Sequence, residues 1–189
     1  ATDGWEVWLK DGRKLYFGIT SASRQDDPAD PARVFKWCLE RVEDSNGNWM
    51  TIEYLKDRGE IYPARIRYTG NRGLAPSNEI LFHLEDRPDW CYLFATDFGV
   101  ATARRLKTVE VRTGGALVRA YALSYGGSPS TGRSLLSRVH QHGTDARIAA
   151  SGDLVSGTSL PPADFTWQAD APAAFSRPSS PAEPRYRSS

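Results

Sequence analysis

The fold is decided by residues 34–54, whose sequence is VFKWCLERVEDSNGNWMTIEY. Polar and apolar side chains alternate on both sides of Asp44–Asn48, a segment that contains the turn-forming pair Asn-Gly. This period of two predicts two β-strands joined by a tight turn, because a helix would repeat its apolar positions every three to four residues. The side chains expected on one face are Phe35, Trp37 and Leu39 before the turn, and Met50, Ile52 and Tyr54 after it.

Similar strand and turn patterns extend outward from this hairpin in both directions. Asp11-Gly12 separates two short aromatic runs and predicts an N-terminal hairpin. Residues 20–33 and 70–78 lack periodicity and are expected to be loops, and residues 91–103 are the one stretch whose pattern leaves room for a short helix. The remaining strands are predicted at residues 5–9, 14–18, 62–69, 79–85, 105–112, 117–125 and 134–142. The sequence therefore predicts an all-β fold of at least eight strands, mostly antiparallel hairpins forming a β-strip or open sheet.

Composition limits the class of protein. The chain has 189 residues, 40% of them apolar, with 24 Lys and Arg against 23 Asp and Glu. This balance gives no field that favours nucleic acid or an anionic membrane, and no apolar run is long enough to span a bilayer. The chain begins with Ala1 and is expected to be an internal fragment. Residues 1–168 are expected to form one module, and the Ala/Pro/Ser-rich residues 169–189 a disordered tail or linker.

Several segments, taken in order, resemble one known family. The N-terminal ones are Trp8-Leu-Lys-Asp-Gly12, Tyr16-Phe-Gly18, the run from Phe35 to Asn48, Ile52-Glu-Tyr54 and the run from Tyr62 to Tyr68. The later ones are Phe82, Glu85 to Asp89, Arg105-Leu106, Val118 to Tyr125, Gly132 to Leu136 and Leu160-Pro-Pro with Phe165. Together they resemble the SpvB family, which comprises Salmonella virulence plasmid B-type proteins and the B components of insecticidal toxin complexes. The resemblance covers residues 4–167.

The resemblance implies an architectural role. In this family such segments lie near Rhs-type repeats, and their β-strips wind into a hollow shell around a toxic cargo. We therefore expect a structural segment of a secreted, extracellular virulence protein, with neighbouring β segments or other toxin-complex subunits as partners. Self-association of the isolated chain is expected, because a strip without its neighbours has unpaired edges. The alternative is a stand-alone extracellular β module that binds carbohydrate or protein. Beyond residue 169 the sequence departs from the family, which would continue into integrin-like repeats, and this suggests a truncated or remodelled gene.

Metal and cofactor sites are not expected. Asp44, Asn46 and Asn48 begin like a calcium loop, but the spacing then requires Gly at 49 and Glu at 55, where the chain has Trp49 and Leu55. His140 and His142 project from the same face of a predicted strand, yet zinc needs three or four ligands, so an exposed polar face is the better interpretation. His83 is expected to be an ordinary strand residue.

Catalysis is not expected either. Gly126-Gly-Ser128-Pro does not have the spacing of a nucleophile elbow, and no phosphate-binding glycine motif is present. ADP-ribosylation belongs, in one family member, to a separate domain with a Glu-x-Glu loop. Here Glu40 and Glu43 are three residues apart. The chain is expected not to be an enzyme.

The remaining candidates are surface and core residues. Arg104, Arg105 and Lys107 are interpreted as a solvated strand edge rather than a polyanion site. Cys38 and Cys91 are interpreted as two buried thiols, with a disulfide as the alternative. Five tryptophans are candidates for stacking on sugars, although most are expected in the core: Trp5, Trp8, Trp37, Trp49 and Trp90.

Overall fold

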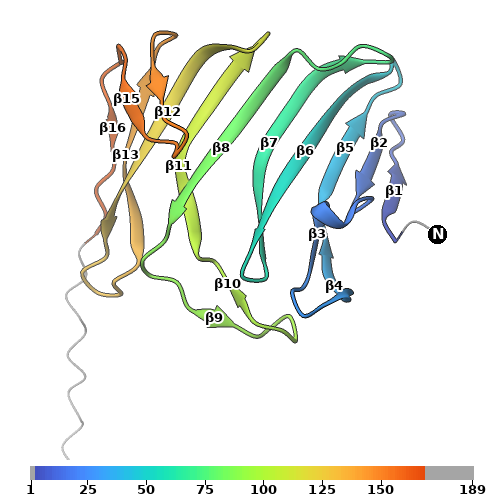
Figure 1. Ribbon diagram of the computed structural model, residues 1–189, viewed down its shortest axis with the longest axis horizontal. Helices are drawn as coiled ribbons and strands as arrows, with labels where there is room; N and C mark the ends of the chain where they lie inside the picture. The colour runs from blue at the N-terminus through green and yellow to red at the C-terminus, as the bar shows by residue number, and fades with distance from the viewer. Residues whose placement is uncertain (1–2, 169–189) are drawn as a thin grey trace, which may run out of the picture.

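A computed structural model describes residues 3–168. Its centre is one ten-stranded antiparallel sheet, seen in Figure 1 as a single curved layer. In their order across the sheet, the strands are β1 (Trp5–Trp8), β2 (Lys14–Phe17), β5 (Leu39–Glu43), β6 (Asn48–Asp57), β7 (Glu60–Asn71), β8 (Asn78–Asp86), β11 (Arg104–Thr113), β12 (Ala116–Gly127), β13 (Ser134–His142) and β16 (Ala163–Asp164). Each strand pairs with the next one in this series, so the sheet is a meander that three hairpins interrupt.

The three interrupting hairpins contain the other six strands and a short 3-10 helix. They are η1 (Ser21–Ser23) with β3 (Arg24–Asp27) and β4 (Asp30–Trp37), then β9 (Tyr92–Leu93) with β10 (Val100–Ala101), and β14 (Arg147–Ile148) with β15 (Leu154–Ser156). The first two lie at the lower rim of the sheet in Figure 1, and the third lies at the upper left. The all-β prediction, with at least eight strands and at most one short helix, is confirmed for residues 3–168.

The hairpin that the sequence marked most clearly forms, but only in part as predicted. Asp44 and Asn48 close its turn, with the Asp44 amide donating to the Asn48 carbonyl over 2.9 Å, and Gly47 has a φ of +81°. Such a backbone conformation favours glycine because a side chain there would be strained. Across the hairpin, Met50 pairs with Val42.

The prediction of one strand from Val34 to Val42 is wrong, because the chain changes sheet at Cys38. The Cys38 amide donates to the Ser23 carbonyl over 2.8 Å, and the Cys38 carbonyl accepts from the Gly18 amide over 2.9 Å. Trp37 consequently pairs with Arg24 in β3–β4, whereas Leu39 pairs with Phe17 in the main sheet. The three side chains predicted on one face are therefore split between two sheets.

The segments between and after the predicted strands are more regular than their sequence indicates. The predicted loop at residues 20–33 is ordered as η1, β3 and the start of β4. Residues 91–103 contain the β9–β10 hairpin instead of a helix, and three short strands follow β13. The expected disordered tail lies outside the described residues.

The buried apolar side chains gather at the lower rim rather than beneath the sheet. Most come from the β6–β7 turn and the β9–β10 hairpin: Ile61, Tyr62, Phe98, Val100, Ala101 and Ala103, with Ala120 elsewhere. The Ala101 amide donates to the Arg58 carbonyl over 3.0 Å and ties the hairpin to the turn. The small core therefore holds the β9–β10 hairpin against the β6–β7 turn at the rim. Most of the large sheet has no second layer packed on it among the described residues.

Candidate interaction surfaces

One face of the large sheet is apolar across β6, β7, β8 and β11, and on the next strand the exposed Arg119 lies opposite Val111. Cross-strand partners share a face, and the register aligns Ile52, Ile66, Ile80 and Val111 in one row across four strands. The next rows add Phe82, Val109, Tyr121, Leu123 and Val139. All of these side chains are half-buried and none is buried. A sheet usually covers its apolar face with another layer, so this face is a candidate interaction surface.

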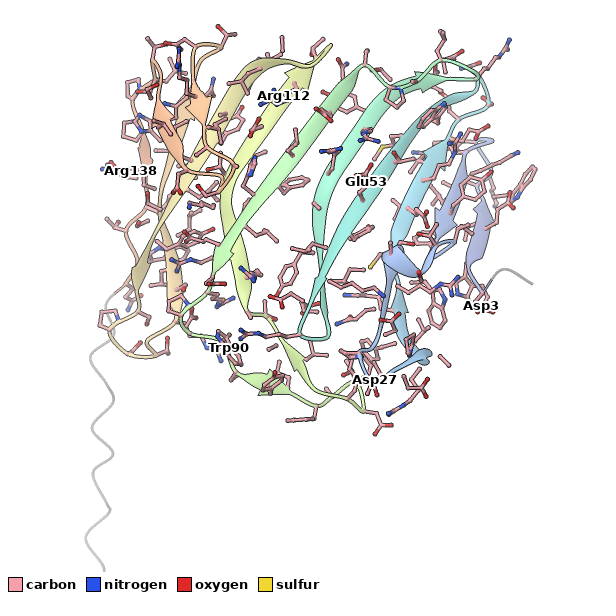
Figure 2. All side chains as sticks on the ribbon, in the orientation of Figure 1. Asp3, Asp27, Glu53, Trp90, Arg112 and Arg138 are labelled. Carbon is pink, nitrogen blue, oxygen red and sulfur yellow. The ribbon has the colours of Figure 1, made fainter. Side chains whose placement is uncertain are left out.

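The opposite face carries charges that neutralise one another. Arg67 lies 3.0 Å from Glu53 and 4.0 Å from Glu79, and Arg65 bridges the same two carboxylates at 3.8 and 3.6 Å. Figure 2 marks this region by Glu53. Exposed pairs of this kind contribute little stability, and their balance leaves no strong field. This face therefore offers no charged recognition surface.

At its C-terminal end the charged face is covered by the β14–β15 hairpin. The Thr108 hydroxyl donates to the Gly152 carbonyl over 2.7 Å, and Lys107 pairs with Asp153 at 2.5 Å. Beneath the cover, Glu110 is buried and holds His83 at 2.5 Å and Arg112 at 2.5 Å. His83 is therefore a strand residue of β8 that faces its neighbours, as predicted, and its partner on β11 is the buried Glu110.

The two histidines of β13 occupy different environments. Their ring centroids are 4.5 Å apart, but only His140 has a ring partner, the Leu160 carbonyl at 3.0 Å. His142 is buried, and neither of its ring nitrogens has a hydrogen-bond partner. The interpretation of both as an exposed polar face is wrong for His142, because the chain after β13 folds back and its Ser159 bridges to His142. In the part of the chain that the structure describes, no three His, Cys, Asp or Glu side chains gather as a metal site.

Acid should destabilise the fold through His142. Burial, and then the neighbouring His140, lower the pKa of His142, while Asp145 opposes this shift. The unfolded chain therefore binds the extra proton more readily, and His142 stabilises the fold fully above about pH 6.5, a contribution that is lost as the pH falls. We expect the free energy of unfolding to fall less between about pH 7.5 and about pH 5.5 in His142→Leu than in the unchanged chain, measured by urea titration. Equal pH dependence of the two proteins would contradict this assignment.

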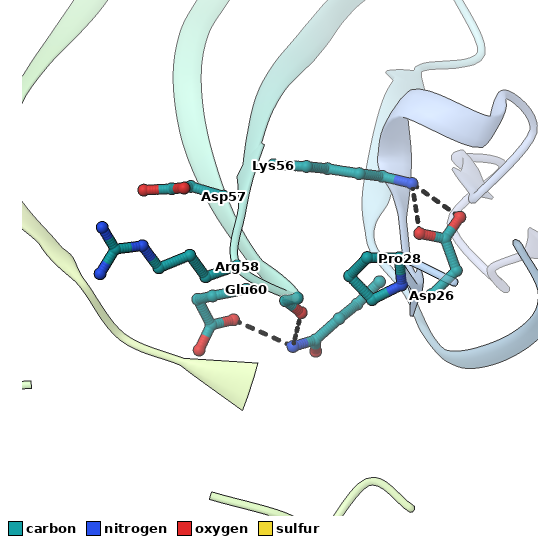
Figure 3. A pocket seen from close by; sticks show the side chains of 8 residues that line it. Asp26, Pro28, Lys56, Asp57, Arg58 and Glu60 are labelled. Carbon is teal, nitrogen blue, oxygen red and sulfur yellow. Dashed lines mark hydrogen bonds and ion pairs between the residues drawn. The ribbon is translucent and has the colours of Figure 1, made fainter. Parts of the chain in front are cut away.

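The cavity at the lower rim is a packing junction (Figure 3). It measures about 170 Å³ and lies between the β3–β4 hairpin and the β6–β7 turn. Lys56 pairs with Asp26 at 2.7 Å, and the Gln25 amide nitrogen donates to the Gly59 carbonyl over 2.9 Å and to Glu60 over 3.2 Å. These polar groups form hydrogen bonds and an ion pair with one another. They therefore hold the β3–β4 hairpin against the β6–β7 turn and do not indicate a ligand site.

The predicted acidic and basic candidates also have structural partners. Both Asp44 oxygens accept hydrogen bonds within their own turn, from the Asn46 and Asn48 amides and the Asn48 side chain. Glu40 accepts from the Thr20 amide and the Ser23 hydroxyl, and Glu43 pairs with Arg41.

The basic cluster is neutralised in the same way. Arg104 pairs with Asp57 at 2.7 Å and Asp86 at 2.6 Å, and Arg105 pairs with Glu85 at 2.6 Å. Together with the pair between Lys107 and Asp153, these contacts occupy all three cations of the candidate patch.

Two expectations of burial are wrong, one for the cysteines and one for the tryptophans. Cys38 is half-buried, which raises the pKa of its thiol, but Cys91 is exposed, and both are free thiols. None of the five candidate tryptophans is buried: Trp5, Trp8 and Trp90 are exposed, and Trp37 and Trp49 are half-buried. The single-layer sheet provides too little interior to enclose such large side chains, so the expectation of core positions is wrong.

The N-terminal part of the chain matches a known protein family in sequence. Residues 1–78 match the family model described as SpvB, Salmonella virulence plasmid 65kDa B protein. The N-terminal part of this chain is SpvB-like. The resemblance read from the sequence is therefore confirmed over these residues. No curated protein matches the chain in sequence.

Solved structures share the fold of this SpvB-like chain. The N-terminal domain of effector protein SpvB from Salmonella typhimurium strain LT2 gives a TM-score of 0.66 at 15% identity, covering 74% of this chain and 61% of that one. The Photorhabdus luminescens Tc holotoxin pore gives 0.70 at 18% identity, and the TcdB2-TccC3-Cdc42 complex gives 0.68 at 17%. They cover 88% and 87% of this chain but only 10% of each toxin chain. The chain thus has the fold of a small segment of toxin-complex proteins.

Among residues 3–168, no helix is long and apolar enough to cross a membrane.

Proposed function

We propose that this SpvB-like chain is a structural segment of a secreted toxin-complex or Rhs-type protein, where it forms part of a β-rich wall that encloses a cargo. The observation that carries the proposal is the apolar face of the ten-stranded sheet, which no described layer buries. A wall one sheet thick needs such an arrangement, with one face turned toward other polypeptide and the other toward solvent. The solved relatives support the proposal because they contain the same fold within much longer chains.

The edges of the sheet support the same role. Within residues 3–168, β1 and β16 each pair on one side only, and β1 carries the exposed Trp5 and Trp8. An unprotected edge offers unpaired N–H and C=O groups to the next strand of a continuing wall. We expect the role to be architectural rather than catalytic. The candidate acids and bases described above form contacts within the chain, and the two thiols lie apart from one another.

The proposal can be tested by making the apolar face polar. In the triple variant Ile66→Thr, Ile80→Thr and Val111→Thr, threonine keeps the β-branched shape but removes apolar surface from this face. If the face is an interaction surface, the isolated chain should self-associate and the triple variant should be about tenfold less associated by light scattering.

A matched control removes the same number of apolar side chains elsewhere. Leu55, Val155 and Leu160 are exposed and lie outside the rows of the apolar face. Changing these three to threonine should leave self-association unchanged. Equal association of all three proteins, with intact circular dichroism spectra, would refute the proposed role of this face.

A further inference from the structure

A cluster of exposed aromatic side chains lies on the β9–β10 hairpin, outside the large sheet. We call Trp90, Tyr92, Leu93 and Phe94 the aromatic patch. Their exposed fractions are 39%, 50%, 60% and 70%, although each is large and apolar. The patch lies at the lower rim, where Figure 2 labels Trp90. Clustered exposed aromatic residues are unusual on a soluble surface and mark interaction sites.

The segment that carries the patch is anchored by buried residues close to it in the chain. Phe98, Val100 and Ala101 of the same hairpin segment are buried in the rim core. Gly99 lets the Tyr92 and Phe94 rings lie close to the backbone, since a Cβ at this position would be 3.4 and 3.3 Å from them. Exposed rings on a fixed support are typical of a binding surface, because little conformational entropy is lost when a partner docks.

Two cations beside the patch lack acidic partners. The Arg58 guanidinium lies over the Trp90 ring, 4.4 Å from its centroid. Arg133 is exposed and lines a cavity of about 100 Å³ together with Trp90 and Leu93. Among residues 3–168, neither Arg58 nor Arg133 forms a salt bridge, whereas the neighbouring Arg87 pairs with Asp89 at 2.9 Å. The patch therefore combines apolar surface with two positive charges that are free to meet carboxylates.

The ring geometry favours a polypeptide over a sugar. Trp90 and Tyr92 meet at 88° with centroids 5.5 Å apart, and Tyr92 and Phe94 are tilted by 34° at 6.3 Å. The rings therefore do not form the flat platform on which successive sugar rings would stack. Rings set at an angle to one another present both faces and edges, which suits contact with the aromatic and aliphatic side chains of a peptide.

We propose that the aromatic patch, with Arg58 and Arg133, is a docking surface for an acidic polypeptide segment that carries aromatic or aliphatic residues beside its carboxylates. The apolar side chains of the peptide pack against the exposed rings, and its carboxylates pair with the two guanidinium groups. This inference does not depend on the wall role, because the patch belongs to a hairpin outside the large sheet. The expected partner is therefore a peptide segment that carries both acidic and apolar side chains.

The test begins with a random 12-residue peptide library displayed on phage and selected on the full chain. We expect enrichment of peptides in which Asp or Glu lies next to Phe, Trp, Leu or Ile. A resynthesised peptide should bind at least tenfold more weakly to Phe94→Ala and to Arg133→Gln, measured by fluorescence anisotropy. Both side chains are exposed, so circular dichroism should show intact folds.

Matched controls and a charge swap sharpen the result. Phe165 and Arg147 are an exposed aromatic residue and an exposed cation on other elements, so Phe165→Ala and Arg147→Gln should leave peptide affinity unchanged. Arg133→Glu should lose the acidic peptide and recover binding to the same peptide with Lys in place of its acidic residues. Enrichment of basic peptides, equal binding to all variants, or a preference for uronic-acid oligosaccharides over every selected peptide would overturn the proposal.

Discussion

Replacing Gly70 with valine is expected to destabilise the SpvB-like chain by about 3 kcal/mol or more. Gly70 lies opposite Trp49 in the β6–β7 pair, and a Cβ at this position would lie inside the van der Waals radius of the Trp49 indole. On its other side the indole is held by the Arg41 guanidinium, 4.4 Å from the ring centroid. The added side-chain atoms must therefore displace β7 or shift the indole from its place beside Gly70. Urea denaturation of both proteins measures the loss.

Gly73 provides the matched control for this change. It lies three residues further along, and a Cβ at Gly73 would meet no atom within 4 Å. Gly73→Val should therefore change the free energy of unfolding by less than about 1 kcal/mol. Similar losses in the two variants would show that backbone effects, rather than contact with Trp49, decide the outcome.

Replacing Glu110 with leucine is expected to cost about 3 kcal/mol as well. The Glu110 side chain is 4% exposed and accepts from His83 and Arg112. Leucine keeps most of the volume but leaves the neighbouring Arg112 without its carboxylate partner and His83 without its acceptor. The loss is costly because the Glu110 carboxylate is shielded from water, which strengthens both of the hydrogen bonds that the substitution removes. Thermal and urea unfolding measure the effect.

Glu53→Leu is the corresponding control. Glu53 also contacts two cations, Arg65 and Arg67, but its side chain is 46% exposed. Water replaces the lost partner there, so the change should cost no more than about 1 kcal/mol. If the two substitutions have equal effects, burial of the Glu110 cluster contributes nothing special to stability.

The strands that the sequence predicted best are those with local signals. The turns at Gly12 and Gly47 have positive φ, as the Asp-Gly and Asn-Gly pairs indicated, and the strands beside them pair with their chain neighbours. The meander of the main sheet follows from such local hairpins. The resemblance to the SpvB family also rested on these strands and their order.

The parts that the sequence did not reveal depend on contacts between distant residues. Residues 20–33 lack the periodicity that would predict strands, but Asp26 pairs with Lys56, and Arg33 joins Asp27 to Asp97. His142 is buried by a later segment of the chain that bridges to it at Ser159. The residue pattern of β13 itself does not predict this contact. The aromatic patch lies in the connection between β8 and β11, and the two cations beside it, Arg58 and Arg133, come from other turns. Periodicity reports which side of a strand is apolar, but not whether another layer covers that side.

The most direct test of the wall role is the molar mass of the unmodified chain, measured by light scattering from micromolar to hundreds of micromolar concentration. A sheet that keeps its apolar face and both edges open should associate, and its mass should rise above the monomer value of 21.0 kDa as concentration increases. A mass that stays at 21.0 kDa throughout the series would contradict the account, since it would show that the sheet is complete on its own.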